Sequence, residues 1–107
     1  MLRSQHNAWV HLAATIIVLI AGIFFRISRP DWCWIVLAII SVWTAEALNT
    51  AFEFLCDVAS PQFHPMVKNA KDVAAGAVLI AAGGAVAIGL LVFLPHVTNL
   101  LRPLLKS

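Results

Sequence analysis

Residues 32–40 read WCWIVLAII, and residues 44–57 read TAEALNTAFEFLCD. The first run is fully apolar, while the second carries polar residues at helical spacing. At about 100° per residue these polar positions fall within one arc of roughly 100°. They are Glu46, Asn49, Thr50, Glu53 and Asp57. The sequence therefore predicts one long helix over about 31–58, with a polar stripe along one side of its second half.

Two further apolar blocks flank this helix. The first spans about 5–25 around the core LAATIIVLI at 12–20, and the last spans about 71–94 and ends at Pro95. Each is long enough for a membrane, which needs roughly 20 helical residues. We expect an all-α membrane protein with three transmembrane helices in one domain over 1–107. The tail, 95–107, is expected to be interfacial or disordered.

Composition supports a membrane protein. Of the 107 residues, 62% are hydrophobic and 11% are charged, whereas a soluble domain carries about 25% charged residues. This excludes a water-soluble fold and a disordered chain. The net charge of +2 comes without a dense basic patch, so we expect no nucleic-acid partner. Cys33 and Cys56 show no disulfide or metal spacing and are expected to be small apolar side chains.

Three spans bring three polar ends to one membrane face. These ends are the start of the first helix, the end of the second and the start of the third. Counting Lys and Arg near each face gives three (Arg3, Lys68, Lys71) against four (Arg26, Arg29, Arg102, Lys106), so charge does not decide the orientation.

The polar stripe predicts phosphoryl transfer at a membrane surface. Ionisable groups at membrane depth are costly unless paired, and Lys71 is the nearest counter-charge. Carboxylates hold Mg²⁺ together with phosphates, and a lysine neutralises phosphate oxygens. Glu46 is nearest the apolar half and can accept the proton of a lipid hydroxyl, whereas Glu53 and Asp57 can reach a metal nucleotide.

Other classes of protein fit less well. The stripe has no Ser or Cys paired with a His, and the chain has no zinc spacing and no glycine-rich phosphate loop. One different class stays open, namely a small proton-coupled transporter or a scaffolding membrane subunit. In that case Glu46 would lie mid-membrane, ATP would not bind and Lys71 would not be needed.

Two motifs identify a resemblance. The pattern E-x-x-N-T-A-x-E-x-x-x-D at 46–57, followed by His64 and by AKDVAAGAVL at 70–79, closely resembles the small prokaryotic diacylglycerol kinase family, which includes undecaprenol kinases. The resemblance covers about residues 4–94. It implies three-span inner-membrane proteins that form homotrimers, with active sites between helices of neighbouring chains at the cytoplasmic face.

The resemblance also implies the reaction. Members use Mg²⁺ and move the γ-phosphate of ATP to a lipid alcohol. We expect diacylglycerol as the acceptor, giving phosphatidic acid in phospholipid synthesis, with undecaprenol as the alternative. Nothing in the acceptor region distinguishes the two, because each presents one hydroxyl on an apolar body.

Roles for individual residues follow from the same resemblance. Glu46 would be the general base, Glu53 a Mg²⁺ ligand that also contacts ATP, and Asn49 and Asp57 would support the site. ATP would lie against Gln62, Phe63, His64, Lys71 and Asp72, and the acceptor lipid against Glu46, Asn7, Trp9 and Ala75. The family commonly has a glutamate as a further metal ligand where this chain has Gln5, a weaker ligand. Family members usually begin with an amphipathic surface helix. Almost nothing precedes Ser4 in this sequence, so we expect either that this helix is absent or that the chain starts late.

Overall fold

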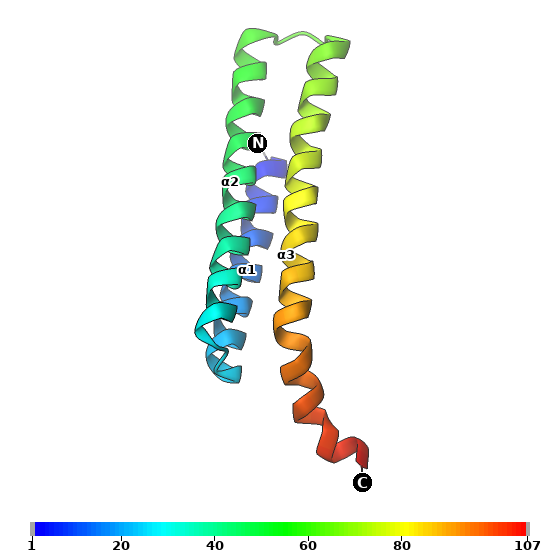
Figure 1. The fold of residues 1–107 in the computed structure, drawn as a ribbon. Helices are drawn as coiled ribbons and strands as arrows, with labels where there is room; N and C mark the ends of the chain where they lie inside the picture. The colour runs from blue at the N-terminus through cyan, green and yellow to red at the C-terminus, as the bar shows by residue number, and fades with distance from the viewer. Residues whose placement is uncertain (1, 107) are drawn as a thin grey trace.

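The computed structural model describes residues 2–106, with side chains from 7 to 105, as three α-helices. They are α1 (Leu2–Phe25), α2 (Arg29–Ala59) and α3 (Pro65–Lys106). The helices run alternately up and down, joined by a tight turn and a short loop (Figure 1). The described part of the chain contains no strand. The predicted all-α fold with three long helices is confirmed.

All three helices are long and apolar enough to cross a membrane. Large apolar side chains lie on the outside of the bundle, and among them Ile17 is 65% exposed and Leu91 is 78% exposed. A soluble monomer rarely exposes so much contiguous apolar surface. This surface suits contact with lipid, and the three helices are those of a membrane protein.

The third helix differs from the prediction at both ends. It begins at Pro65 rather than at about 71, and it continues through Pro95 and Pro103 to Lys106. Proline is well tolerated in the first turn of a helix, where no internal acceptor exists for its missing N–H. Inside α3, Pro95 removes a hydrogen bond without ending the helix, and the Thr98 hydroxyl donates to the Pro95 carbonyl at 2.9 Å. The last third of α3 bends away from the bundle (orange to red in Figure 1), as expected near an internal proline.

The turn between α1 and α2 is tightly built. Arg26 has a φ of 52°, the left-handed conformation that commonly ends a helix. Ser28 caps α2, because its hydroxyl accepts a hydrogen bond from the Asp31 N–H at 3.2 Å. Gly22 lets the two helices approach, since a Cβ there would come within 2.5 Å of the Trp32 ring. The turn, the cap and the contact of Gly22 with Trp32 thus hold the end of α1 against the start of α2.

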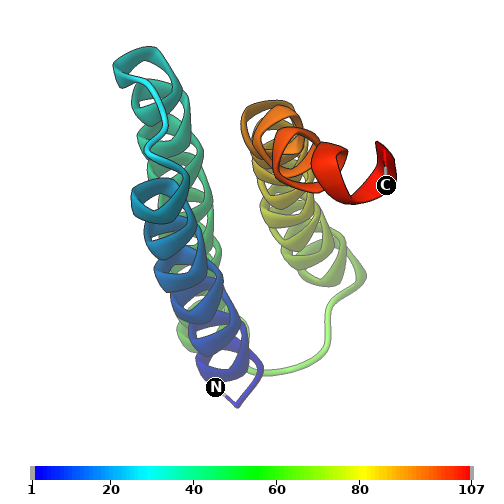
Figure 2. The same ribbon diagram turned by 90° about the horizontal axis from the view of Figure 1, so that it is seen from below.

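The bundle is best packed at this same end. Ile27, Ile35 and Val92 form its buried cluster, with Phe25 and Phe93 packed against them. Along the bundle, α2 packs more extensively against α3 than α1 does against either helix. Seen from below, α1 and α2 overlap on one side of the view and α3 stands on the other (Figure 2). The opposite end, where α2 passes into α3, is more open and polar.

Candidate active site

The C-terminal end of α2, the loop at 60–64 and the first turns of α3 enclose a polar cavity of about 430 Å³. The loop folds back at this point because α2 ends at Ala59, where the Ser60 N–H donates to the Cys56 carbonyl at 2.8 Å. Pro65 then starts α3. We call this space the polar cavity; it is lined by Glu53, Asp57, Ser60, Pro61, Gln62, Phe63, His64, Val67, Lys68, Lys71, Asp72 and Ala75.

Two lysine–aspartate ion pairs line the polar cavity. The Lys71 Nζ lies 2.9 Å from the Asp57 Oδ1 and joins α3 to α2. Within α3, Lys68 pairs with Asp72 at 2.9 Å. The prediction that Lys71 supplies the counter-charge of the stripe is confirmed. Exposed pairs of this kind contribute only about 0–1 kcal/mol to stability, so both lysines can exchange their carboxylate partners for an anionic ligand at little cost.

Asn49 connects the polar cavity to the interior of the bundle. Its side chain is buried, and its Nδ2 donates to the Glu53 Oε1 at 3.2 Å. This contact spans one helical turn and orients the Glu53 carboxylate towards one side of α2. The Asn49 Oδ1 is buried and has no hydrogen-bond partner among the residues the structure describes. A buried polar atom without a partner is costly, so this oxygen is suited to receive a ligand donor.

Glu46 lies one turn deeper and is 4% exposed. Neither carboxylate oxygen has a hydrogen-bond partner within the described chain, and the His11 Nε2 of α1 lies 3.4 Å from the Glu46 Oε2. A buried carboxylate needs such a partner, because an isolated charge in an apolar interior is strongly disfavoured.

His11 is not among the residues predicted from the sequence to form the site, because helix periodicity cannot show which faces of two different helices meet. One signal was present, since an ionisable side chain inside an apolar span is a functional candidate by default.

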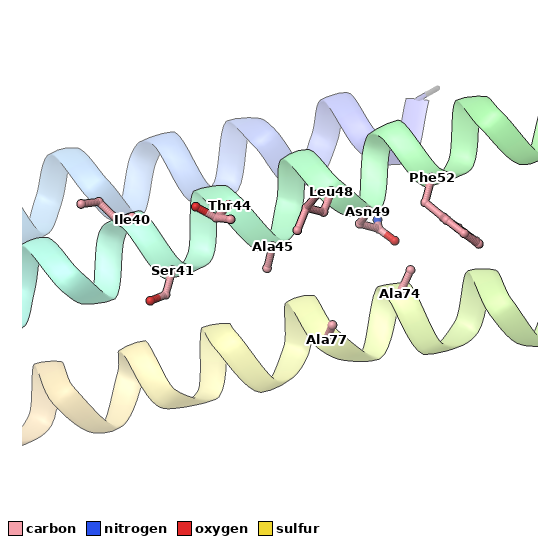
Figure 3. A pocket seen from close by; sticks show the side chains of 9 residues that line it. All are labelled: Ile40, Ser41, Thr44, Ala45, Leu48, Asn49, Phe52, Ala74 and Ala77. Carbon is pink, nitrogen blue, oxygen red and sulfur yellow. The ribbon is translucent and has the colours of Figure 1, made fainter.

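A second, apolar cavity of about 600 Å³ lies between α2 and α3 (Figure 3). It is lined by Ile40, Ser41, Thr44, Ala45, Leu48, Asn49, Phe52, Ala74 and Ala77. The close-up shows Ala45 and Asn49 directed towards α3, with Ala74 and Ala77 facing them (Figure 3). Asn49 belongs to this wall and also bonds Glu53 of the polar cavity. An apolar molecule with one polar end could therefore place that end at Asn49.

The structure gathers most of the predicted site residues at the polar cavity, whereas Glu46 lines neither cavity. Ala75 lines the polar cavity and not the apolar one. On α1, Asn7 and Trp9 are exposed and line neither cavity. The Gln5 side chain falls outside the described residues.

The oxygen ligands in the polar cavity fit a divalent cation that is shared with a phosphate. Glu53 and Asp57 both line it, and the described residues contain no group of three or more His, Cys, Asp or Glu side chains that could hold a metal alone. Mg²⁺ in kinases is typically held by one or two carboxylates, with phosphate and water completing the shell. The residues present fit that arrangement.

Comparison with known proteins agrees with this chemistry. The family described as prokaryotic diacylglycerol kinase matches residues 1–93. An undecaprenol kinase of Bacillus subtilis is 43% identical over 93 residues, which cover 87% of this chain and 76% of that relative. A diacylglycerol kinase of Synechocystis is 34% identical over 99 residues, covering 92% of this chain and 57% of that relative, so the chain spans less than two thirds of its length. No solved structure matches.

Proposed function

The chain belongs to the prokaryotic diacylglycerol kinase family, a family of lipid kinases, and on this basis we propose that it transfers the γ-phosphate of ATP to the hydroxyl group of a membrane lipid. The observation that carries the proposal is the polar cavity, where carboxylates and two lysines meet at one end of an apolar bundle. The charged groups of the cavity suit a metal nucleotide. The hydrogen bond from Asn49 to Glu53 links it to the apolar cavity, whose wall suits a lipid.

The residues divide the work by depth. Lys68 and Lys71 exchange their carboxylate partners for phosphate oxygens of the nucleotide, and the loop at 62–64 borders it. Glu53, oriented by Asn49, and Asp57 hold Mg²⁺, which neutralises phosphate charge when bound. Deeper in the bundle, Glu46 accepts the proton of the lipid hydroxyl as that oxygen attacks the γ-phosphorus, and the bond from the γ-phosphorus to the β–γ bridging oxygen breaks to release ADP.

We favour undecaprenol as the acceptor, with diacylglycerol as the second candidate. Of the two relatives, the undecaprenol kinase has the higher identity, at 43% against 34%. The apolar cavity is compatible with either lipid, because its wall carries few polar groups and is open along α2 and α3.

A transfer assay tests the reaction and the acceptor together. Purified protein in lipid micelles receives radiolabelled ATP and either undecaprenol or diacylglycerol, with or without Mg²⁺. We expect labelled lipid only with Mg²⁺, and more product from undecaprenol. Higher kcat/KM with diacylglycerol would reverse the acceptor preference. A transporter or scaffold would transfer no label to any lipid, and that result would reject the proposal.

We also propose a homotrimer whose active sites are completed by neighbouring chains. Support comes from Asn7 and Trp9, which line neither cavity within one chain, and from α1, which packs only lightly against α2 and α3. Chemical cross-linking in a mild detergent should give a ladder that ends at three chains. Monomer alone, at concentrations that support activity, would contradict the trimer.

The proposed location is the inner membrane, with the polar cavity facing the cytoplasm, where ATP is available. With Cys33 and Cys56 changed to Ser, which removes the exposed thiol at the other end of the bundle, Gln62→Cys places a single thiol in the exposed loop. In intact cells, a membrane-impermeant maleimide should leave this thiol unlabelled and should label it once the membrane is opened. Ready labelling of intact cells would invert the orientation.

A further inference from the structure

The His11 side chain of α1 lies next to the Glu46 carboxylate of α2 inside the bundle. The His11 Nε2 lies 3.4 Å from the Glu46 Oε2, with 14% of the His11 side chain and 5% of the Glu46 side chain exposed. Both Glu46 oxygens are buried without a hydrogen-bond partner in the described chain. In an apolar interior a carboxylate in this state is displaced or neutralised unless a donor holds it. His11 is in place to be that donor.

Two hydrogen bonds join Thr15 to the His11 backbone and to Trp43, and the Trp43 ring packs against the His11 ring. The Thr15 hydroxyl donates to the His11 carbonyl at 2.7 Å, and the Trp43 Nε1–H donates to the same hydroxyl at 3.0 Å. Trp43 then contacts the His11 imidazole edge-on, with ring centroids 6.2 Å apart. Trp43 lies one turn before Glu46 on α2. Its contacts with Thr15 and His11 therefore hold this part of α1 next to Glu46. An arrangement of this kind resembles the support that functional side chains need to be precisely oriented.

The remaining wall around His11 is apolar. A cavity of about 340 Å³ lies beside it, and the side of α3 that faces this cavity consists of Ala82, Ala85, Val86 and Gly89. None of these residues can donate a hydrogen bond from its side chain to Glu46 or change its charge. If His11 served packing alone, an apolar side chain of similar size would suit this wall better than a polar one.

We propose that His11 is a positioning residue that donates its Nε2–H to Glu46 and so holds that carboxylate ready to accept the proton of the lipid alcohol. The proposal rests on the proposed function for its kinetic consequence and on the Nε2–Oε2 contact for its structure. After Glu46 takes the hydroxyl proton, the new O–H bond is on Glu46, and His11 keeps its own proton throughout.

Two substitutions at position 11 separate positioning from packing. His11→Gln keeps a donor N–H near the Nε2 position, whereas His11→Leu keeps the volume and removes the donor. We expect His11→Leu to lower kcat about tenfold or more, in line with the loss expected when a catalytic group is misplaced. The KM for ATP should not change, and His11→Gln should keep at least half of the wild-type kcat. A kcat for His11→Leu equal to or above that of His11→Gln would overturn the proposal.

His96 provides a matched control. Its Nε2 lies 4.0 Å from the Asp31 Oδ2, and its side chain is 31% exposed at the far end of the bundle. The same two substitutions at His96 should leave kcat within twofold of wild type. If His96→Leu lowered kcat as much as His11→Leu, the effect would be a general loss of packing and the proposal would fail.

A spectroscopic measurement makes the test independent of the folding of the position-11 variants and of the kinase assay. The imidazole nitrogens of the four histidines are labelled with ¹⁵N in otherwise wild-type protein and in Glu46→Gln. We expect the His11 Nε2 signal to be that of a hydrogen-bonded N–H and to move in Glu46→Gln, while the His96 signals stay in place. Unchanged His11 signals would reject the contact. If wild type transfers no phosphate to any lipid while the His11 signals behave as expected, the proposed function fails and the contact stands.

Discussion

Residue by residue, the candidate site is a graded series along α2. Asp57 is exposed and paired with Lys71, Glu53 is half-buried and bonded to Asn49, and Glu46 is buried beside His11. The order from water to interior matches the order of the proposed roles, since a nucleotide comes from water and a lipid from the apolar side. The gradient follows from placing polar residues at helical spacing along a helix that enters the apolar bundle.

Replacement of the buried carboxylate should stop the chemical step alone. We expect Glu46→Gln to lower kcat by roughly 10²- to 10⁴-fold, the typical contribution of a general base. ATP affinity, measured by isothermal titration or by fluorescence of a nucleotide analogue, should change by less than twofold. Near-normal turnover in this variant would show that another group accepts the proton.

Loss of the cationic partner of Asp57 should act on nucleotide binding. Lys71→Met removes a positive charge from the polar cavity and leaves the Asp57 carboxylate to repel phosphates. We expect ATP affinity to fall about tenfold or more, with little change in thermal stability because the pair is exposed. Arg102→Met, which removes an exposed charge outside the cavity, is the control. Equal loss of affinity in both variants would point to net charge rather than to Lys71.

The polar residues of α2 are predictable from the sequence, whereas their contacts with other helices are not. The stripe at Glu46, Asn49 and Glu53 follows from periodicity within one helix, which a sequence displays directly. Pairing between helices depends on how they rotate and shift against each other, which no single-helix pattern reports. For that reason Lys71 was correctly expected to meet the stripe, because few lysines were available, whereas the approach of His11 to Glu46 was not foreseen.

At the level of elements, the three helices were predictable because long apolar runs have no other stable form in lipid. Their ends were less predictable. Pro95 normally ends a helix in water, yet α3 continues past it to Lys106 with a bend. The residues after Pro95 remain helical, so the one missing hydrogen bond bends α3 without ending it.

The close approach of α1 and α2 at Gly22 should be sensitive to a single methyl group. A Cβ at Gly22 would lie 2.5 Å from the Trp32 ring, whereas one at Gly84 would meet nothing within 4 Å. We expect Gly22→Ala to lower stability by about 1–3 kcal/mol through overpacking, seen as a lower midpoint of thermal unfolding in detergent. Gly84→Ala should not lower it. Equal midpoints for the two variants would mean that the Trp32 ring moves aside freely.

For the whole molecule, the small number of potential metal ligands predicts how the kinase activity depends on Mg²⁺. Within the described chain no group of three or more potential metal ligands exists, so any Mg²⁺ depends on the nucleotide for part of its coordination. Chelation of divalent cations should therefore abolish phosphate transfer and leave the folded protein intact by circular dichroism. Readdition of Mg²⁺ should restore activity fully within the assay time. Loss of helical signal on chelation would instead indicate a structural metal.

The length of α3 has a consequence for where the reaction occurs. The section before Pro95, residues 65–94, is 30 residues long (94 − 65 + 1), about 45 Å at 1.5 Å per residue. A bilayer measured from headgroups to headgroups is about 40–45 Å thick. If the first turns of α3 sit among the headgroups of one leaflet, Pro95 comes out among those of the other. Asp57 and Glu53, near the end of α2, then lie close to headgroup depth, and a lipid substrate can reach the polar cavity sideways from its own leaflet.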